Sequence, residues 1–168
     1  MNKRLVMWLT IGIVPVLVSC AGSGRALGPV GPQPVQVDTL APAGFLKVYT
    51  ATEDHAEGGM QYYPHTGYTV YAEDGKTVVT NVANASSVHD EDASLVQLPA
   101  GKYVVEAKAD RYGTVRVGVA IEKGQLTAVN LRYDWNHPSP PGKASDWVRL
   151  SDGTVVGWSA GASASQSQ

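Results

Sequence analysis

Apolar and polar residues alternate with a period of two in the second half of the chain. Every second residue from 103 to 109 is apolar, and the alternation returns from 115 to 121. Because successive side chains of a β-strand point to opposite faces, this pattern predicts two strands that each bury one face. The predicted inward positions are Tyr103, Val105, Ala107, Ala109, Val115, Val117, Val119 and Ile121. No window of this region shows the helical pattern, in which apolar residues recur three and then four positions apart, so the sequence predicts an all-β fold.

Turn sequences divide the rest of this region into further strands. Segment 45–52 alternates in the same way, and Asp74-Gly75 separates two apolar runs, which is typical of a β-hairpin. Residues 122–125 form another predicted turn, which leads into a last strand with Val129 and Leu131 inward. About seven short strands predict an antiparallel β-sandwich of the Ig-like or transthyretin-like kind, with a small barrel as the alternative.

The C-terminal part of the chain predicts a separate β-hairpin. Residues 134–145 contain three prolines and are interpreted as a linker, and residues 146–158 then form two short apolar runs around a Ser151-Asp152-Gly153 turn. Trp147 and Trp158 lie at the open ends of this hairpin, where they are expected to cover a sheet edge or one end of the core. A binding platform is the alternative. The small polar residues 159–168 predict a disordered tail.

The first nineteen residues have the pattern of a secretory signal peptide. Lys3 and Arg4 precede the apolar run 5–18, which is short for a membrane span. Leu17-Val18-Ser19-Cys20 resembles the bacterial lipobox, and the resemblance implies that Cys20 receives a diacylglyceryl group and becomes the new N-terminus. Two or more acyl chains hold a protein stably on a bilayer. An ordinary signal peptide, cut elsewhere to leave a free thiol, is the alternative.

Residues 20–43 comprise the lipidated cysteine and a segment rich in Gly and Pro, interpreted as a flexible tether that lifts the domain off the lipid. An early edge strand that contains Val35 and Val37 is the alternative. The resemblance to lipoproteins places the chain in the cell envelope, anchored to a membrane. In a cell with two membranes, Ala21 after the cysteine favours the outer one.

Charge and composition exclude some classes of binding partner. The 13 basic and 15 acidic residues give a net charge of -2, and no basic stripe interleaved with aromatic residues occurs, which argues against a nucleic-acid partner. Acidic residues dominate between 53 and 92, and basic residues between 101 and 149. Cys20 is the only cysteine, so the domain is expected to depend on apolar packing rather than disulfides.

Aromatic residues crowd one glycine-rich segment. Tyr62, Tyr63, His65 and Tyr68 lie among Gly58, Gly59 and Gly67, and such rings with polar edges suit sugar stacking or peptide contact. These four residues are the candidate ligand-binding site. The alternative is that Tyr62 and Tyr68 end strands, with their hydroxyl groups in water.

Sequence spacing gives no sign of metal or catalytic chemistry. The four histidines, His55, His65, His89 and His137, lie singly in predicted loops, without the close pairs typical of zinc sites. The acidic segments 53–57 and 89–92 lack the alternating ligands and turn glycine of a calcium loop, and are interpreted as solvated loops. Neither a nucleophile elbow nor a phosphate loop occurs. The sequence therefore predicts no enzyme and no cofactor.

A family resemblance supports the fold and suggests a role. Segment 98–131 resembles the second half of carboxypeptidase regulatory-like and PEGA-type domains, through Leu98-Pro99, Gly101 and Tyr103, with Tyr112 and Gly113 in the reverse of the usual order. The resemblance implies a transthyretin-like β-sandwich, here over residues 44–133, that acts as a spacer, a support or a contact surface. We therefore expect a lipid-anchored envelope module with a non-catalytic interaction or structural role. The partners are expected to be the membrane and envelope proteins or glycans. Glycan binding through the tyrosine segment is the alternative, and a metal-dependent enzyme is the third class.

Overall fold

The computed structural model describes residues 24–26, 28–36, 42–133 and 144–160. Within these ranges the regular structure is β-strand, apart from a 3₁₀ turn at Ala144–Asp146. The predicted all-β fold is therefore confirmed. The signal segment with Cys20, most of the proline-rich linker and residues 161–168 of the predicted tail lie outside the described residues. The first two tail residues correct the expectation of disorder, because the Ser159 N–H donates to the Asp146 carbonyl and the Ala160 N–H to the Pro29 carbonyl. None of the helical structure among the described residues is long and apolar enough to cross a bilayer.

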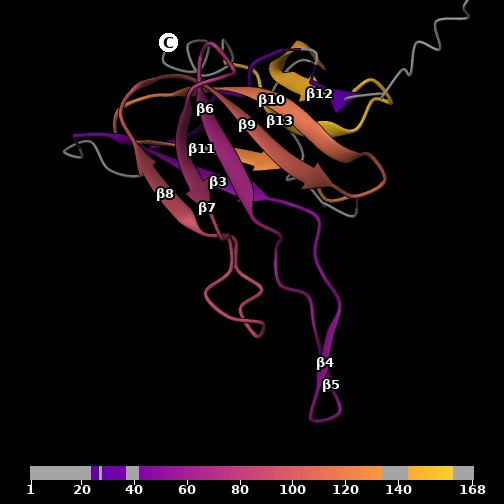
Figure 1. Ribbon diagram of the computed structural model, residues 1–168. Helices are drawn as coiled ribbons and strands as arrows, with labels where there is room; N and C mark the ends of the chain where they lie inside the picture. Colours follow the sequence, from indigo (N-terminus) through magenta and orange to yellow (C-terminus); the bar gives the residue numbers. More distant parts are fainter. Residues whose placement is uncertain (1–23, 27, 37–41, 134–143, 161–168) are drawn as a thin grey trace, which may run out of the picture.

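Two sheets pack face to face as a β-sandwich (Figure 1). The five-stranded sheet has the order β1-β10-β9-β6-β7, with β1 Gly24–Arg25, β6 Tyr68–Ala72, β7 Val78–Val82, β9 Gly101–Ala109 and β10 Gly113–Ile121. The four-stranded sheet has the order β2-β11-β3-β8, with β2 Pro32–Gln36, β3 Gly44–Tyr49, β8 Leu95–Leu98 and β11 Gln125–Asn130. All pairings in the two sheets are antiparallel except β1 with β10 and β3 with β11.

The core lies between the two sheets and follows the predicted alternation. Every predicted inward position of β9 and β10 is buried except Tyr103, which is half-buried. Leu46 and Val48 of β3 and Val129 of β11 meet them from the other sheet and are fully buried. The period-two pattern thus identified the residues whose removal from water stabilises the fold.

The two turns predicted within the sandwich are confirmed, and they have different roles. The turn at 73–77 joins β6 to β7 within one sheet: Gly75 has a φ of +65°, and the Asp74 Oδ1 accepts hydrogen bonds from the Lys76 and Thr77 backbone N–H groups. The turn at 122–124 instead carries the chain from β10 in one sheet to β11 in the other. Gly124 there has a φ of +71°, which L side chains rarely adopt.

The N-terminal segment corrects the expectation of a free tether through residue 43. Val30 is fully buried, its N–H donates to the Gly118 carbonyl, and its carbonyl accepts from Ala120. The alternative of an early edge strand is confirmed for Val35, which lies in β2 at the edge of the four-stranded sheet; Val37 is outside the described residues. Pro32 and Pro34 fit this edge position, since an edge strand tolerates missing N–H donors.

The C-terminal hairpin forms as predicted and packs on the sandwich. β12 (Trp147–Arg149) pairs with β13 (Val155–Trp158), with Trp147 opposite Trp158. The two indoles stack with ring centroids 4.3 Å apart, and both are buried. Gly157 lies so close to Val30 that a Cβ there would meet its Cγ1 at 2.5 Å. The hairpin therefore covers the N-terminal segment and one side of the core.

Candidate functional site

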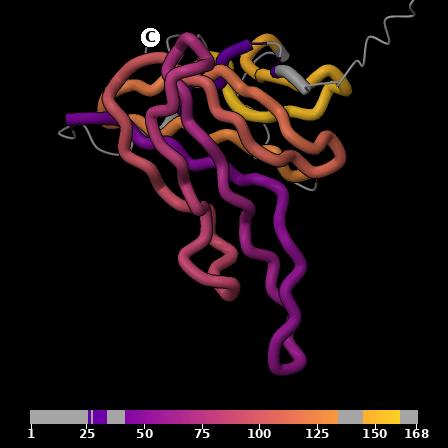
Figure 2. The backbone as a smooth tube through the Cα atoms, viewed as in Figure 1, coloured from indigo at the N-terminus to yellow at the C-terminus, as the bar shows by residue number. Residues whose placement is uncertain are grey.

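Two segments project together from one end of the sandwich (Figures 1 and 2). The first is the protruding hairpin, residues 53–64, which contains β4 (His55–Glu57) and β5 (Met60–Tyr62). The second is the β7–β8 loop, residues 83–94. Gly58 and Gly59 connect β4 to β5, with φ values of +59° and +81°. Two consecutive residues at positive φ are typical of the tight hairpin turn that matches strand twist.

A buried polar cluster joins both segments to the sandwich. Asn84, at the start of the β7–β8 loop, is fully buried, and its amide Nδ2 lies 2.9 Å from the Val48 carbonyl, 3.1 Å from Thr50 Oγ1 and 3.2 Å from the Thr66 carbonyl. Its Oδ1 accepts a hydrogen bond from the Ser94 N–H at the other end of the loop. Asn84 has a φ of +67°, a conformation that Asn tolerates better than most residues. We call Asn84, Thr50, Thr66 and His65 the root cluster.

Two of the four predicted ligand-binding residues are part of the interior. His65 is 4% exposed, and its Nδ1 lies 2.8 Å from the Thr50 carbonyl, which fits an N–H donor at Nδ1. Burial lowers the pKa of His65. Tyr68 is 5% exposed at the start of β6, its hydroxyl has no hydrogen-bond partner among the described residues, and burial raises its pKa. The structure thus leaves His65 and Tyr68 almost no exposed surface, and the alternative that placed the Tyr68 hydroxyl in water is wrong.

Tyr62 and Tyr63 lie near the surface of the projection. Tyr62 ends β5, and its ring meets that of His89 edge-on, with centroids 4.6 Å apart. Tyr63 is 45% exposed, and its backbone N–H donates to Glu91 Oε1 at 2.7 Å, which links the protruding hairpin to the β7–β8 loop. Met60, at the tip, is 60% exposed. These residues offer apolar and aromatic surface beyond the sandwich.

Three ionisable side chains meet where the two segments touch. His55 and Glu57 come from β4, and His89 comes from the β7–β8 loop. Glu57 Oε2 lies 2.6 Å from His89 Nε2 and 3.7 Å from His55 Nε2. The hydrogen bond from His89, followed by its charge, lowers the pKa of the Glu57 carboxyl. All three side chains face solvent.

The expectation that the histidines lie singly is therefore wrong for His55 and His89, whose ring centroids are 6.2 Å apart. Sequence spacing missed the pair because 34 positions separate the two residues. One signal was present: His55 and Glu57 are two apart, and in a strand such side chains point to the same face. The sequence analysis interpreted 53–57 as a loop, whereas the structure forms strand β4 there. Nothing in the sequence indicated that the β7–β8 loop would reach that face.

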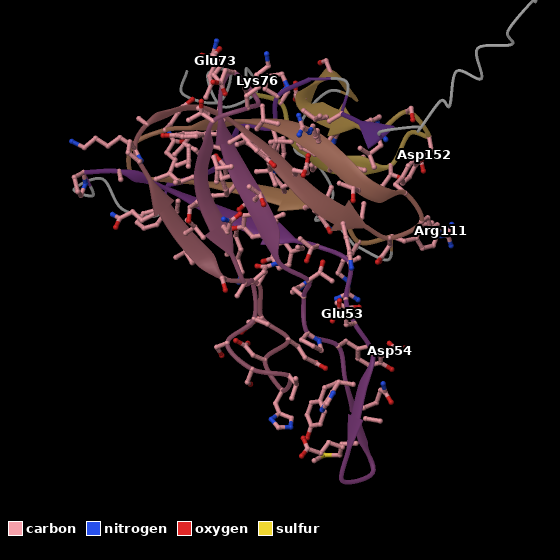
Figure 3. All side chains as sticks on the ribbon, in the orientation of Figure 1. Glu53, Asp54, Glu73, Lys76, Arg111 and Asp152 are labelled. Atoms are coloured by element: carbon pink, nitrogen blue, oxygen red, sulfur yellow. The ribbon has the colours of Figure 1, made fainter. Side chains whose placement is uncertain are left out.

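The acidic residues lie at both ends of the molecule, and some of them have structural roles. Asp90 accepts hydrogen bonds from the Ser86 hydroxyl and N–H and from the Asp92 N–H, so it maintains the shape of the loop, and these bonds lower its pKa. Glu53 and Asp54 lie at the base of the protruding hairpin, while Glu73 is at the opposite end of the molecule (Figure 3). The acidic stretch predicted from sequence is thus not confined to one end.

An open depression of about 330 Å³ lies on the outer face of the five-stranded sheet. Its polar lining includes Thr69, Asn81, Glu106, Lys108 and Thr114. Tyr68 and Ala107 also border it, but these residues belong to the buried core. The depression therefore presents polar groups, without an aromatic surface suited to stacking.

Comparisons with known proteins identify no relative of this chain. Its sequence matches no family model and no curated protein, and its structure matches no solved structure.

Proposed function

We propose that the chain is a lipid-anchored cell-envelope module with a non-catalytic interaction or structural role, and that the projection is its contact element. The lipobox-like sequence and the resemblance to transthyretin-like spacer domains, both stated above, support the anchor and the class. The observation that carries the proposal is the projection itself, in which two segments extend from the sandwich and present Met60 and Tyr63 to solvent.

The root cluster favours a contact role because it fixes the projection before any partner arrives. Asn84 ties the β7–β8 loop to β3 and to the segment that follows the protruding hairpin. The link between Tyr63 and Glu91 then holds the two segments against each other. A surface ordered in advance loses less conformational entropy on binding, so more of its contact energy contributes to affinity.

The position of β1 limits the distance between the sandwich and the membrane. If Cys20 is acylated, only residues 21–23 separate it from Gly24, where β1 begins. Four Cα–Cα steps span at most about 14 Å. The proposal therefore places the sandwich close to the lipid headgroups, rather than on the long tether that composition alone suggests.

Site-specific photocrosslinking in intact membranes tests the contact role. A photoreactive phenylalanine analogue at position 63 is expected to give discrete adducts, because this side chain is exposed on the projection. The same analogue at Lys76, an exposed position at the opposite end (Figure 3), is the matched control. Adducts from position 76 with none from position 63 would contradict the proposal.

Glycan binding is the second candidate, supported by the exposed ring of Tyr63 beside the half-buried ring of Tyr62. The same crosslinking experiment separates the two candidates. If a muramidase or polysaccharide lyase reduces the mass of the adducts, and a protease digests only the chain itself, the partner is a glycan. Adducts with the opposite sensitivity identify a protein.

A further inference from the structure

We propose that His55, Glu57 and His89 form a binding site for Zn²⁺, which connects the protruding hairpin to the β7–β8 loop. The inference goes beyond the proposed function, since it concerns a ligand of the projection rather than the membrane anchor or the partner. It revises the sequence expectation of no metal site, which considered each histidine alone.

The geometry of the three side chains suits a tetrahedral ion. One imidazole nitrogen from each histidine and one Glu57 oxygen all lie within 4.8 Å of one another. Zinc–ligand distances of about 2.0–2.1 Å place tetrahedral ligand atoms about 3.3 Å apart. The 3.7 Å between His55 Nε2 and Glu57 Oε2 is close to this separation, and the 2.6 Å between His89 Nε2 and Glu57 Oε2 is shorter. Since no two of the three ligand atoms are more than 4.8 Å apart, side-chain shifts of about 1.5 Å or less bring them to the separation that zinc requires.

The chemistry of the ligands selects the metal. Two imidazoles and one carboxylate are a set that Zn²⁺ prefers, whereas Ca²⁺ takes six to eight oxygen ligands. Three protein ligands leave one tetrahedral position for water or for a group from a partner. That position is accessible, because the side chains of His55, His89 and Glu57 are 38%, 49% and 60% exposed.

The surrounding contacts hold the ligands in place without the ion. Strand β4 presents His55 and Glu57 on one face, and the Tyr62 ring packs edge-on against His89 at an interplanar angle of 69°. The Tyr63 N–H to Glu91 bond holds the two segments together a few residues away. Binding therefore needs little new ordering of the backbone, which favours a measurable affinity.

An exposed ion pair is the competing explanation of the same contacts. A solvent-exposed Glu–His pair contributes little to stability and has no need of a second histidine. The two explanations differ in one measurable respect. Ion pairs of Glu57 with His89 and His55 need no metal ion, while a metal site predicts Zn²⁺ binding that depends on all three side chains.

Calorimetric titration of ZnCl₂ into the full chain tests the site. The protein is purified in detergent without a polyhistidine tag and treated with a chelator. We expect saturable binding of one ion per chain, and no saturable heat with CaCl₂. His55→Ala, His89→Ala and Glu57→Gln should each weaken binding by about tenfold or more, since even residues that only orient a ligand affect affinity to that extent.

Matched controls separate the site from adventitious binding. His137→Ala removes a histidine outside the described residues, and Glu73→Gln removes an exposed carboxylate at the opposite end (Figure 3). Both should bind Zn²⁺ like the unaltered chain. Absence of saturable binding at millimolar Zn²⁺, unchanged affinity in His55→Ala, or loss of binding in His137→Ala would each overturn the proposal.

Limited proteolysis gives a second readout that does not depend on heat. Chymotrypsin cleavage after Tyr62 should slow when Zn²⁺ is added, because the ion links β4 to the loop beside β5. His89→Ala should abolish this protection. Protection that persists in His89→Ala would contradict the link. Neither outcome bears on membrane anchoring or on crosslinking from position 63, so the proposals fail independently.

Discussion

Asn84 offers the sharpest test of how the projection is attached to the sandwich. The side chain is fully buried, and its four hydrogen-bond contacts reach three separate parts of the chain: β3 with the adjoining Thr50, the segment at Thr66, and the far end of its own loop at Ser94. Asn84→Ala removes this partner from all of these groups, of which Thr50 Oγ1 and the Thr66 carbonyl keep the hydrogen bond between them.

The hydrogen bonds that Asn84→Ala removes determine how much stability the variant should lose. A typical hydrogen bond contributes about 1 kcal/mol net, and a buried group left without a partner costs about 1–3 kcal/mol. Water that enters the space left by the side chain recovers part of this loss. We therefore expect Asn84→Ala to lower the free energy of unfolding by about 3 kcal/mol.

Two further variants separate the loss of hydrogen bonds from the other effects of the substitution. Asn84→Gly also lacks the amide but accepts the φ of +67° without a steric cost, so the loss common to both variants measures the hydrogen bonds. Asn84→Asp keeps an acceptor for Ser94 but places a carboxyl group against the Val48 and Thr66 carbonyls. Burial raises the pKa of that group, so its protonated form is favoured in the fold. Asn84→Asp should therefore lose stability as the pH rises from about 4 towards neutral.

Urea unfolding of a chain that begins at residue 21, followed by tryptophan fluorescence, measures these differences. Amide hydrogen exchange should also accelerate at 83–94 in Asn84→Ala, since the loop loses its attachment. The reasoning is refuted if both Asn84→Ala and Asn84→Gly unfold within about 0.5 kcal/mol of the unaltered chain, the range of an ordinary surface substitution.

Three other variants test the interior by the same unfolding assay. Tyr68→Phe should leave stability unchanged or raise it, because the buried hydroxyl has no partner among the described residues; a loss above about 1 kcal/mol would reveal a missed hydrogen bond. Val117→Ala should cost about 1–3 kcal/mol, because Val117 is fully buried between the sheets; a loss below about 0.5 kcal/mol would contradict that placement. Burial lowers the pKa of His65 below 6.5, so the unfolded chain binds a proton more readily and stability should fall as the pH drops below about 6.5. His65→Asn keeps a donor for the Thr50 carbonyl and should remove that part of the pH dependence, and an unchanged slope would show that another group causes it.

The fold was largely predictable because burial imposes a period of two on each strand. The alternation at 103–109 and 115–121 identified β9 and β10, and Asp74-Gly75 identified the hairpin between β6 and β7. These signals are local, so a single sequence contains them. The partition of strands into sheets was not predictable: the turn at 122–124 has the sequence of a hairpin, yet it crosses between sheets.

The N-terminal segment and the candidate metal site depend on contacts between distant parts of the chain. Glycine and proline between 24 and 36 suggested a tether, but Val30 bridges to Val119 and Ser159 and is buried there. The meeting of Glu57 with His89 likewise depends on the β7–β8 loop, which Asn84 holds at its root. Neither contact leaves a periodic pattern, so neither can be inferred from spacing.

Membrane anchorage through Cys20 is the central claim of the proposed function, and the mass of the N-terminal peptide tests it most directly. The chain extracted from membranes should begin at Cys20 and bear a diacylglyceryl group on its sulfur, and Cys20→Ala should move the protein to the soluble fraction. A mature N-terminus at any other residue, or a Cys20 thiol without lipid, would contradict the account.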